Sequence, residues 1–473
     1  MSDVIIVGGG ISGLSTAAFL RAGGADVRVL EAGARPGGNL QTTAEDGRLI
    51  DHAANGWLDN EPAVGRLLAL LGPEAAPVGP SDQYGTRWIF ARGALHPAPL
   101  SPPALLRSRL LSFGEKLRLL GDLFAPRGVS GRAAGQGDED ESVGAFVRRR
   151  LGAGAVDRLV GPMVAGIFAA DPDLLSLRGA FPRMFELERD HRSLLLAMLR
   201  LRRGGAPAGK LHTTATGAGG LSEAIAATLG DRLVLGAPAT SLRATGGRWS
   251  LSTPQGDFSA EQVIFATPAP VSARLLGPLD GALGAQLGAF RFAPATVVVT
   301  AWGPEAFPRP PRGFGVLVAR GDNRADPATA GVLGTVFTSE VFPSQAQPGE
   351  HLLRSIVGGA ILPEAAALDD QALLGRVRAH LQACLGAPRE APRWTRVLRH
   401  PIGIPQLAVG HPAQVAALQA AEAGLPGVHL TGNYLTGVGV KDCVRAGEAA
   451  ARRLLDGGGR PSPQLSEASS KLH

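Results

Sequence analysis

The sequence is poor in the residues on which several classes of protein depend. It has two cysteines, Cys384 and Cys443, which form no C-x-x-C pair and are too few for a disulfide framework. The ten histidines are scattered, with no H-E-x-x-H motif and no cysteine–histidine cluster, so we expect no metal site. No apolar run approaches the roughly 18 residues that a membrane-spanning helix needs. These absences favour a globular protein in a reducing compartment.

Lysine is also scarce: it occurs at four positions, so nearly all of the net charge of +6 comes from arginine. A pI near 9.9 raises nucleic-acid binding as one class of function, but no nucleic-acid-binding module accompanies it, so we expect no nucleic-acid partner. A basic chain also suits an acidic ligand or an anionic membrane surface. Because the chain enters an apolar strand directly after Asp3, without a basic segment, we expect no secretory signal and a cytoplasmic location.

Glycine and apolar residues, by contrast, are abundant. The chain has 473 residues, of which 65 are glycine and 45% are hydrophobic, so we expect two or three lobes rather than one core. The run Val4–Val7 predicts a buried strand, and Gly8, Gly10 and Gly13 follow the dinucleotide-binding pattern G-x-G-x-x-G. These glycines permit, in order, a tight turn, the approach of a pyrophosphate and close packing of a helix, which we expect over Ile11–Ala22. The N–H groups and partial positive charge at the start of that helix would hold the phosphates.

A second strand is expected over Val27–Leu30, and Glu31 at its end is placed to accept hydrogen bonds from ribose hydroxyls. The glycine motif alone is weak evidence in a glycine-rich chain, and an ordinary glycine loop is the alternative. Here the motif follows a strand, opens a helix and precedes an acid 18 positions after Gly13. The run E-x-x-x-R-x-G-G from Glu31 to Gly38 resembles the flavoproteins with two dinucleotide-binding motifs, where it binds FAD rather than NAD. Arg35 would then lie near the phosphates or the ribose.

A helical block is predicted from residue 101 to about 203. Ser112 and Glu115 have the spacing of a capping box. Apolar residues recur at helical intervals after this box, at Phe113, Leu117, Leu120 and Phe124. Between Arg87 and Arg132, eight basic residues stand against two acids. A basic, apolar helical element without a spanning segment is typical of a membrane interface, and a plain bundle helix with a solvated face is the alternative.

The second half of the chain changes character. Alternating strands and loops from Ala295 to Gly359 predict an antiparallel sheet, and a helix is expected over Gln371–Leu385. Near the end, Leu430–Cys443 predicts a strand and a glycine-rich turn, and Cys443–Leu455 predicts a helix. No strand follows this unit, so we expect its helix to return to the first domain with its amino terminus facing the same cofactor. There it would stabilise negative charge on a reduced flavin ring.

Together these features resemble the FAD-dependent amine-oxidase superfamily. The middle of the chain resembles the oxygen-dependent protoporphyrinogen oxidases, including their coproporphyrinogen-oxidising bacterial members. The matching segments span most of the chain in the order found in that family. They are Asn55–Asp59, Arg87–Phe90, Ser101–Pro103, Gly166–Asp171, Gly313–Val318, Leu333–Phe337, Val357–Gly359, Pro401–Gln406 and Gly432–Gly439.

The resemblance implies the α/β fold class with an α+β substrate lobe. It comprises a Rossmann-like FAD-binding domain, an antiparallel-sheet substrate domain and a helical membrane-binding insertion. The FAD-binding domain would consist of residues 1–85, 206–270 and 401–457. The substrate domain would consist of residues 86–100 and 271–400, and the insertion of residues 101–205. Residues 458–473 are expected to form a disordered tail.

The reaction that the resemblance implies is the six-electron oxidation of a porphyrinogen to a porphyrin. Three hydrides pass in turn to non-covalently bound FAD, which molecular oxygen reoxidises with release of hydrogen peroxide. No catalytic side chain beyond the flavin is implied, because the protein mainly positions an apolar macrocycle and anchors its propionates. Arg87 matches the arginine that pairs with a propionate, a task suited to a bidentate guanidinium. Leu317, Val336 and Ile356 match apolar residues that sandwich the macrocycle, and Asn55 matches a polar residue near the ring and the flavin. From the sequence pattern alone, Arg87 would be a surface arginine, and the three apolar residues would belong to the ordinary core of a sheet.

Further positions match the cofactor-binding residues of that family. They are Gly8, Gly10, Ile11, Ser12, Gly13, Glu31, Ala32, Arg35, Gly37, Gly38, Asn39, Asn55, Gly56, Ala239, Ala266, His400, Gly432, Asn433, Val438, Gly439 and Val440. Three places depart from the family pattern. The run Ala53–Gly56 replaces the usual Gly-Pro-Asn-Ser, His400 stands where an aromatic residue is common, and Leu407 stands where tyrosine is frequent. All three are expected near the cofactor, so altered substrate preference or reduced activity is an alternative outcome.

The sequence thus predicts a peripheral enzyme on the inner face of the cell membrane that makes protoporphyrin IX in haem biosynthesis. Coproporphyrinogen III is the alternative substrate. Another flavin amine oxidase and a catalytically silent flavin or porphyrin carrier are alternative functions. The expected partners are a tetrapyrrole, molecular oxygen and an anionic membrane surface, and a homodimer is left open.

Overall fold

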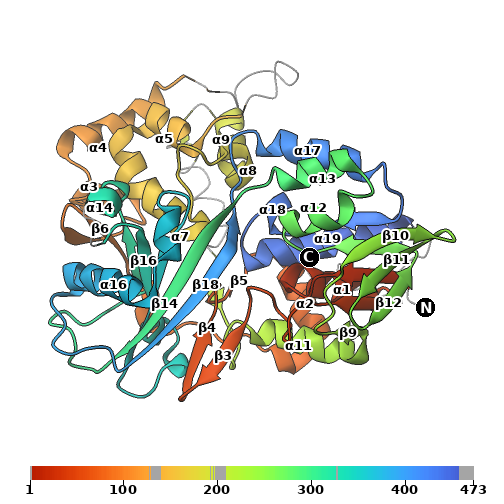
Figure 1. The fold of residues 1–473 in the computed structure, drawn as a ribbon. Coiled ribbons are helices and arrows are strands. Elements are labelled where there is room, and N and C mark those ends of the chain that lie inside the picture. The colour runs from red at the N-terminus through yellow and green to blue at the C-terminus, as the bar shows by residue number, and fades with distance from the viewer. Residues whose placement is uncertain are drawn as a thin grey trace.

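The computed structural model describes residues 3–126, 128, 140–191, 193, 194, 197, 209–325 and 329–457. Figure 1 shows a sheet covered by helices, a second sheet with two long strands, β14 and β18, and a lobe of short helices. The α/β class is therefore confirmed. At the amino terminus, the strand Val4–Val7, the helix Ile11–Ala22 and the strand Val27–Leu30 have the predicted bounds.

The first sheet has five parallel strands in the order β19-β13-β1-β2-β9. They are β1 (Val4–Val7), β2 (Val27–Leu30), β9 (Leu233–Val234), β13 (Gln262–Phe265) and β19 (Val428–Leu430). Alternate residues of β1 enter different hydrophobic cores: Ile6 packs in one, Ile5 and Val7 in the other. Both faces of the sheet are thus buried, as is usual for a parallel sheet.

Helices cover the two faces of this sheet. One face carries α1 (Ile11–Ala22), α2 (Pro62–Leu71), α11 (Gly220–Leu229) and α19 (Val440–Gly457). The other carries α12 (Ala269–Leu276), α13 (Gly281–Gly288), α17 (His411–Glu422) and the small sheet of β10 (Ser241–Thr245), β11 (Arg248–Thr253) and β12 (Gly256–Ala260). The return of the last helix to the first domain is confirmed, and it begins at Val440 rather than Cys443. Because α12 and α13 share a core with β1, the expected start of the substrate domain at residue 271 does not coincide with a boundary between cores.

The second sheet has seven strands in the order β18-β14-β17-β16-β15-β6-β7. They are β6 (Arg87–Ala91), β7 (Ala94–Pro97), β14 (Phe292–Trp302), β15 (Gly315–Val318), β16 (Val332–Phe337), β17 (His351–Gly358) and β18 (Trp394–Pro405). Neighbours are antiparallel except β6 and β15, which run parallel, so the sheet is mixed rather than purely antiparallel. Helix α16 (Asp370–Leu385) packs on one face. On the other face Ile50, from the hairpin of β3 (Thr42–Glu45) and β4 (Arg48–Asp51), packs with Val297.

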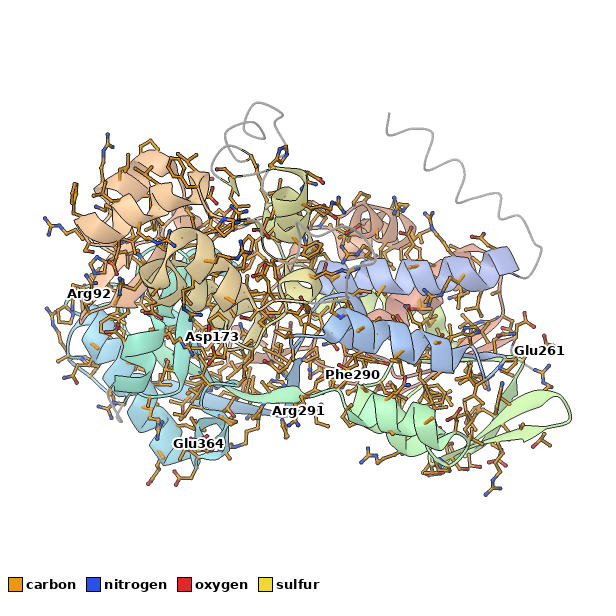
Figure 2. The ribbon with its side chains drawn as sticks, turned by 90° about the horizontal axis from the view of Figure 1, so that it is seen from above. Arg92, Asp173, Glu261, Phe290, Arg291 and Glu364 are labelled. Carbon is orange, nitrogen blue, oxygen red and sulfur yellow. The ribbon has the colours of Figure 1, made fainter. Side chains whose placement is uncertain are left out.

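The long strands connect the two sheets. Figure 2 shows Phe290 and Arg291 where the chain leaves α13 and enters β14. The backbone of Gln406, just beyond β18, donates a hydrogen bond to the carbonyl of Arg291 at 2.9 Å. The outgoing and returning segments are therefore bonded to each other at this junction.

The remaining helices form a lobe beside the second sheet (Figure 1). They are α3 (Pro102–Arg107), α4 (Phe113–Leu119), α5 (Val143–Leu151), α6 (Ala153–Ala155), α7 (Gly161–Phe168), α8 (Leu177–Ala180) and α9 (Pro182–Asp190). The capping box of Ser112 and Glu115 is confirmed. Residues 127, 129–139, 192, 195, 196 and 198–205 of the predicted insertion lie outside the described residues, as do residues 206–208 after it and the predicted tail 458–473. In the part of the chain that is described, no helix has the length and apolar character needed to cross a membrane.

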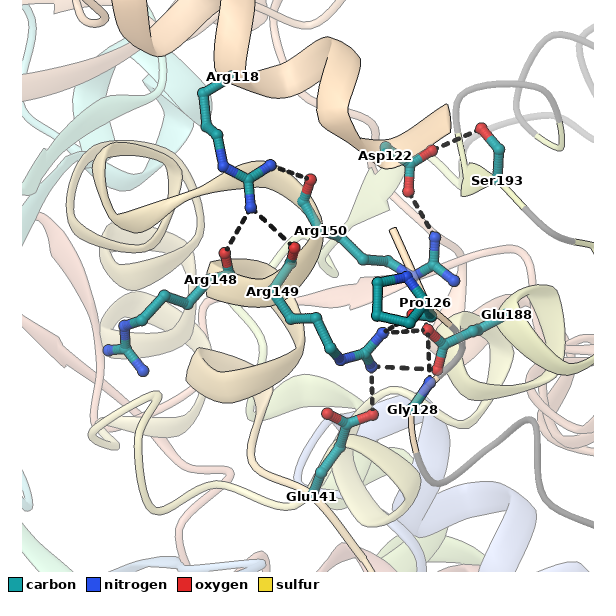
Figure 3. A network of polar contacts seen from close by, with 10 residues as sticks. All are labelled: Arg118, Asp122, Pro126, Gly128, Glu141, Arg148, Arg149, Arg150, Glu188 and Ser193. Carbon is teal, nitrogen blue, oxygen red and sulfur yellow. Dashed lines mark hydrogen bonds and ion pairs between the residues drawn. The ribbon is translucent and has the colours of Figure 1, made fainter. Parts of the chain in front are cut away.

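A buried network of charges joins the helices of this lobe (Figure 3). The guanidinium of Arg150 contacts Asp122 at 2.7 Å and Glu188 at 2.6 Å, and all three side chains are fully buried. Arg149 contacts the same Glu188 at 2.7 Å and Glu141 at 2.7 Å. Loss of Arg150 would remove the cation that pairs with both Asp122 and Glu188 inside the lobe, where an uncompensated charge is costly. The network therefore fixes α5 and α9 against the turn that contains Asp122.

Candidate active site

Four strands of the first sheet end side by side. The register pairs Val7 with Leu30 and with Phe265, and it pairs Phe265 with Leu430. The residues that follow these strand ends are Glu31, Gly8, Ala266 and Thr431. They leave the sheet along one carboxyl edge, which is where open parallel sheets bind ligands.

The turn after β1 leaves room for a ligand beside α1. Gly8 has a φ of +109°, which residues with a side chain rarely adopt. A Cβ atom on Gly13 would collide with the carbonyl oxygen of Gly8, so α1 could not pack so closely with any other residue there. A Cβ atom on Gly10 would meet no atom within 4 Å. Gly10 thus borders open space, and no described side chain caps the first turn of α1 next to it, which contains Ile11 and Ser12.

Glu31 lies against this turn. Its Oε2 accepts a hydrogen bond from the Gly9 N–H at 2.6 Å, and its Oε1 accepts one from the Gly33 N–H at 2.7 Å. The Gly37 N–H donates to the Gly9 carbonyl at 2.7 Å and so ties the second pair of glycines to the first turn. Each carboxylate oxygen of Glu31 keeps a lone pair for a ribose hydroxyl.

Arg35 contacts other residues of the chain. Its Nη2 donates to the carbonyl of Thr42 at 2.8 Å and forms an ion pair with Glu223 at 3.1 Å. The neighbouring candidates Ala32, Gly38 and Asn39 are exposed, and Ala239 is half-buried at the margin of the core that contains β1.

The last glycine turn reaches the same edge of the sheet. Gly432, two residues after the end of β19, has a φ of +147°, and Asn433 opens the short helix α18 (Asn433–Thr436). Val438 packs against the core of the helical lobe, and the Gly439 N–H donates to Asp442 at 3.2 Å. Helix α19 then starts at Val440, which packs in the same core as α1. The two distant glycine turns therefore meet at one site.

The segment from His52 to Gly56 crosses between the two sheets. The side-chain amide nitrogen of Asn55, Nδ2, is buried and has no hydrogen-bond partner among the described residues. Gly56 has a φ of +151°, and a Cβ atom there would collide with the carbonyl of His212. A residue with a side chain therefore does not fit this backbone at position 56.

His400 connects the second sheet to this segment. Its Nε2 lies 3.0 Å from the carbonyl oxygen of His52. Burial lowers the pKa of both His52 and His400. Both rings are therefore neutral near pH 7, so His400 fills the usual aromatic position without adding a charge. Leu407, the third departure, is buried in the core of the helical lobe.

Three neighbouring strands of the second sheet share an unusual feature. Leu317, Val336 and Ile356 are half-buried, while the residues on either side of each are buried. Leu317 packs against Gly166 of α7, and Ile356 packs with Ala165 of the same helix. The sheet surface thus opens at the three positions that match the macrocycle contacts.

Arg87 stands on the same face of the sheet. It pairs in register with Gly315, and Gly315 pairs with Val336. The Arg87 side chain is exposed, and its guanidinium lies 5.3 Å from the centre of the Phe314 ring. Among the described residues no carboxylate forms an ion pair with it, so its planar fork is free for a ligand.

Two charged residues near this site were missed by the sequence analysis. Arg354 interrupts the apolar run of β17 and is buried, and its Nε and Nη2 groups have no hydrogen-bond acceptor in the described chain. Asp51 is also buried and accepts bonds from Thr42, Ala218 and Gln345, while burial raises its pKa. A charge inside an otherwise apolar strand was the available signal for Arg354.

The site contains the features that a flavin dinucleotide requires. They are the open space at Gly10, the helix terminus beside it that has no side-chain cap, and the amide of Asn55, which has no partner among the described residues. Within the described residues, no three histidine, cysteine, aspartate or glutamate side chains are grouped so as to hold a metal ion.

Comparison with known proteins identifies the family. The sequence profile of the flavin containing amine oxidoreductases matches residues 11–455. The chloroplastic protoporphyrinogen oxidase of Oryza sativa subsp. japonica is 31% identical over 96% of this chain and 88% of its own length. The coproporphyrinogen III oxidase of Bacillus subtilis (strain 168) is 29% identical over 96% of this chain and 99% of its own length. A solved structure from Exiguobacterium sp. 255-15 superposes with a TM-score of 0.81, at 26% identity, over 96% of this chain and 98% of that one. The chain therefore belongs to the flavin containing amine oxidoreductases, in the group of the protoporphyrinogen and coproporphyrinogen III oxidases, and its cofactor is FAD.

Proposed function

We propose that this protein oxidises a porphyrinogen to the corresponding porphyrin with molecular oxygen as the acceptor. Protoporphyrinogen IX is the predicted substrate, and coproporphyrinogen III is the alternative. One observation carries the proposal: three half-buried apolar side chains share one sheet face with Arg87, which forms no ion pair among the described residues. In the overall reaction, one porphyrinogen loses six hydrogen atoms to three oxygen molecules and gives one porphyrin and three hydrogen peroxide molecules.

The residues of the chain bind and orient the substrate. FAD supplies the two-electron oxidation when it is bound. Leu317, Val336 and Ile356 offer a dry, flat surface to the macrocycle, and Arg87 binds a propionate at its margin. In this proposal the amide of Asn55, which has no partner among the described residues, donates to the ring or to the cofactor. This arrangement needs no acid–base pair among the side chains, because positioning is the task left to the protein.

The direct test is turnover in air. Purified holoprotein is mixed separately with protoporphyrinogen IX, coproporphyrinogen III and a set of polyamines, and porphyrin fluorescence and peroxide are followed. We expect porphyrin to form well above the autoxidation rate, with three peroxides per porphyrin. Peroxide from amines alone would show an amine oxidase instead. Porphyrin formation no faster than autoxidation, without peroxide from amines, would show a silent carrier.

The positions of the lysines also favour a porphyrinogen over an amine. Amine-oxidising members often place a lysine near the flavin. Here Lys116 donates to the carbonyl of Leu106 in the helical lobe, and Lys441 donates to Asn60 at 2.9 Å. Lys210 is exposed next to β8 (Leu211–His212), and Lys471 lies outside the described residues.

The cofactor half of the proposal is tested at Gly10. Gly10→Val should fold, because the backbone at Gly10 is extended, with φ −73° and ψ 172°, and its Cβ would meet no atom. The valine side chain would fill the space proposed for the pyrophosphate, so we expect the purified variant to be colourless and to bind added FAD at least about 100-fold more weakly. Gly65→Ala in α2, which also adds a Cβ atom in open space, is the matched control and should keep its flavin spectrum. A yellow Gly10→Val protein would contradict the placement.

The substrate half is tested at Arg87. Arg87→Ala removes a charge-assisted bond to a propionate, so KM should rise about 10- to 100-fold while FAD content is unchanged. Arg87→Lys should recover part of the loss, because lysine keeps the charge but not the fork. Arg243→Ala, at an exposed strand position in the nucleotide-binding part, serves as the control. Kinetics unchanged by Arg87→Ala would remove this residue from the site.

We further propose that the helical lobe contacts an anionic membrane surface at the inner face of the cell membrane. The four residues of the predicted apolar stripe are turned outward: Phe113, Leu117, Leu120 and Phe124 are 77%, 52%, 53% and 80% exposed. Leu106 nearby is 69% exposed. Monomeric soluble proteins seldom expose so many large apolar side chains together. The basic residues Arg107, Arg109 and Arg118 accompany them, which suits acidic lipid headgroups.

Liposome flotation checks this contact. The triple variant Phe113→Glu, Leu117→Glu, Leu120→Glu should remain with the soluble fraction when vesicles contain phosphatidylglycerol, while the unmodified protein floats. A triple variant at Leu174, Leu279 and Val409, which are exposed apolar residues outside the stripe, is the control and should float. Flotation of the stripe variant would place the membrane contact elsewhere.

A further inference from the structure

The second sheet carries two arginines in one cross-strand row. The register pairs Arg87 with Gly315, Gly315 with Val336, and Val336 with Arg354. Residues that are paired in this way project from the same face of a sheet. Their chain neighbours confirm the assignment, because Trp88, Val316 and Leu353 all pack on the opposite face, against the core under α16.

Arg87 and Arg354 therefore flank Val336. Three strand spacings separate their Cα atoms, which is about 14 Å at roughly 4.8 Å per strand. Arg354 is also two residues from Ile356 on the same strand and face, so it borders two of the three residues proposed to contact the macrocycle. Two guanidinium groups then stand at opposite margins of one apolar surface.

Arg354 lacks the partner that a buried guanidinium needs. It is 4% exposed, and its Nε and Nη2 groups have no hydrogen-bond acceptor within the described chain. The carboxylate whose charge acts on it is Asp51. Asp51, however, accepts its bonds from Thr42, Ala218 and Gln345, and it forms no ion pair with Arg354. An arginine keeps its charge even when buried, so these N–H groups require an anion.

We propose that Arg354 is a second carboxylate anchor, opposite Arg87, that selects a tetrapyrrole with carboxylates on both edges. This inference rests on the proposed function. Coproporphyrinogen III carries four propionates, one on each pyrrole, and so presents a carboxylate to each arginine. Protoporphyrinogen IX carries two propionates on adjacent pyrroles and engages one arginine at a time. Arg354 thus shifts the preference toward coproporphyrinogen III, the alternative substrate, and away from protoporphyrinogen IX.

The test uses the FAD-loaded protein and three porphyrins: coproporphyrin III, protoporphyrin IX and coproporphyrin III tetramethyl ester. Binding is measured from the quenching of porphyrin fluorescence. Arg354→Met should weaken coproporphyrin III binding about 10- to 100-fold, protoporphyrin IX binding less than about threefold, and ester binding not at all. Arg396→Gln is the control: Arg396 lies in the same row at the outer edge strand, exposed, and should change none of the three affinities.

Methionine is chosen because replacing a buried charge by an apolar residue of similar volume is often tolerated. If that variant does not fold, Arg354→Lys is measured in its place. We then expect coproporphyrin III to bind about three- to tenfold more weakly and the ester to bind unchanged. Equal losses for all three porphyrins, or no loss for coproporphyrin III, would overturn the proposal. Turnover separates this outcome from failure of the proposed function. If the unmodified protein oxidises neither porphyrinogen, the proposed function is wrong. If the variant turns over both substrates with an unaltered preference, only the role of Arg354 is wrong.

Discussion

The structure depends on the alignment of four parallel strand ends. Val7, Leu30, Phe265 and Leu430 share one register, although they come from segments up to 423 positions apart (430 − 7). Because parallel strands end at the same edge, every loop that follows them starts from one line. The glycine turn at Gly8, the acid at Glu31 and the second glycine turn at Gly432 are neighbours for this reason. The order of the strands, rather than any single residue, assembles the cofactor site.

The second sheet is placed against this edge by a small number of buried polar contacts. Asp51 receives hydrogen bonds from Ala218 of the first part and Gln345 of the second, so one carboxylate joins them. His400 contacts the carbonyl of His52 across the same interface. Burying these groups is costly unless each is satisfied, which makes the relative position of the sheets specific. Asn55 and Arg354 are among the buried groups whose donors have no partner in the described part of the chain, and ligands are proposed at both.

Local sequence signals predicted the local structure well. The strand, glycine turn and helix at the amino terminus matched residue for residue, because apolar periodicity and glycine chemistry act over a few neighbouring positions. The return of α19 to α1 was also predicted, since a strand–turn–helix unit with no partner of its own had to join another sheet. The charge of Arg354 inside an apolar run is visible in the sequence, but its role is not. Its significance depends on cross-strand pairing with Val336 and on the commitment of Asp51 to other donors. Likewise, nothing in the sequences of β6 and β15 indicates that these two strands pair in parallel, so the sheet was expected to be antiparallel.

The helical lobe shows an unusual division between charged and apolar residues. Its interior includes the fully buried side chains of Asp122, Arg150 and Glu188, while Phe113 and Phe124, two large apolar residues, are exposed. Hydrophobic burial alone would favour the opposite arrangement. A buried ion network gives little net stability compared with an apolar core. It nevertheless holds its helices in one geometry, because a shift would leave a buried charge without its partner. The ionic contacts thus act beside an apolar core that includes Phe146 and Phe168, while Phe113 and Phe124 remain available for an external surface. A helix that used Phe113 for its own core could not also present it to a lipid bilayer.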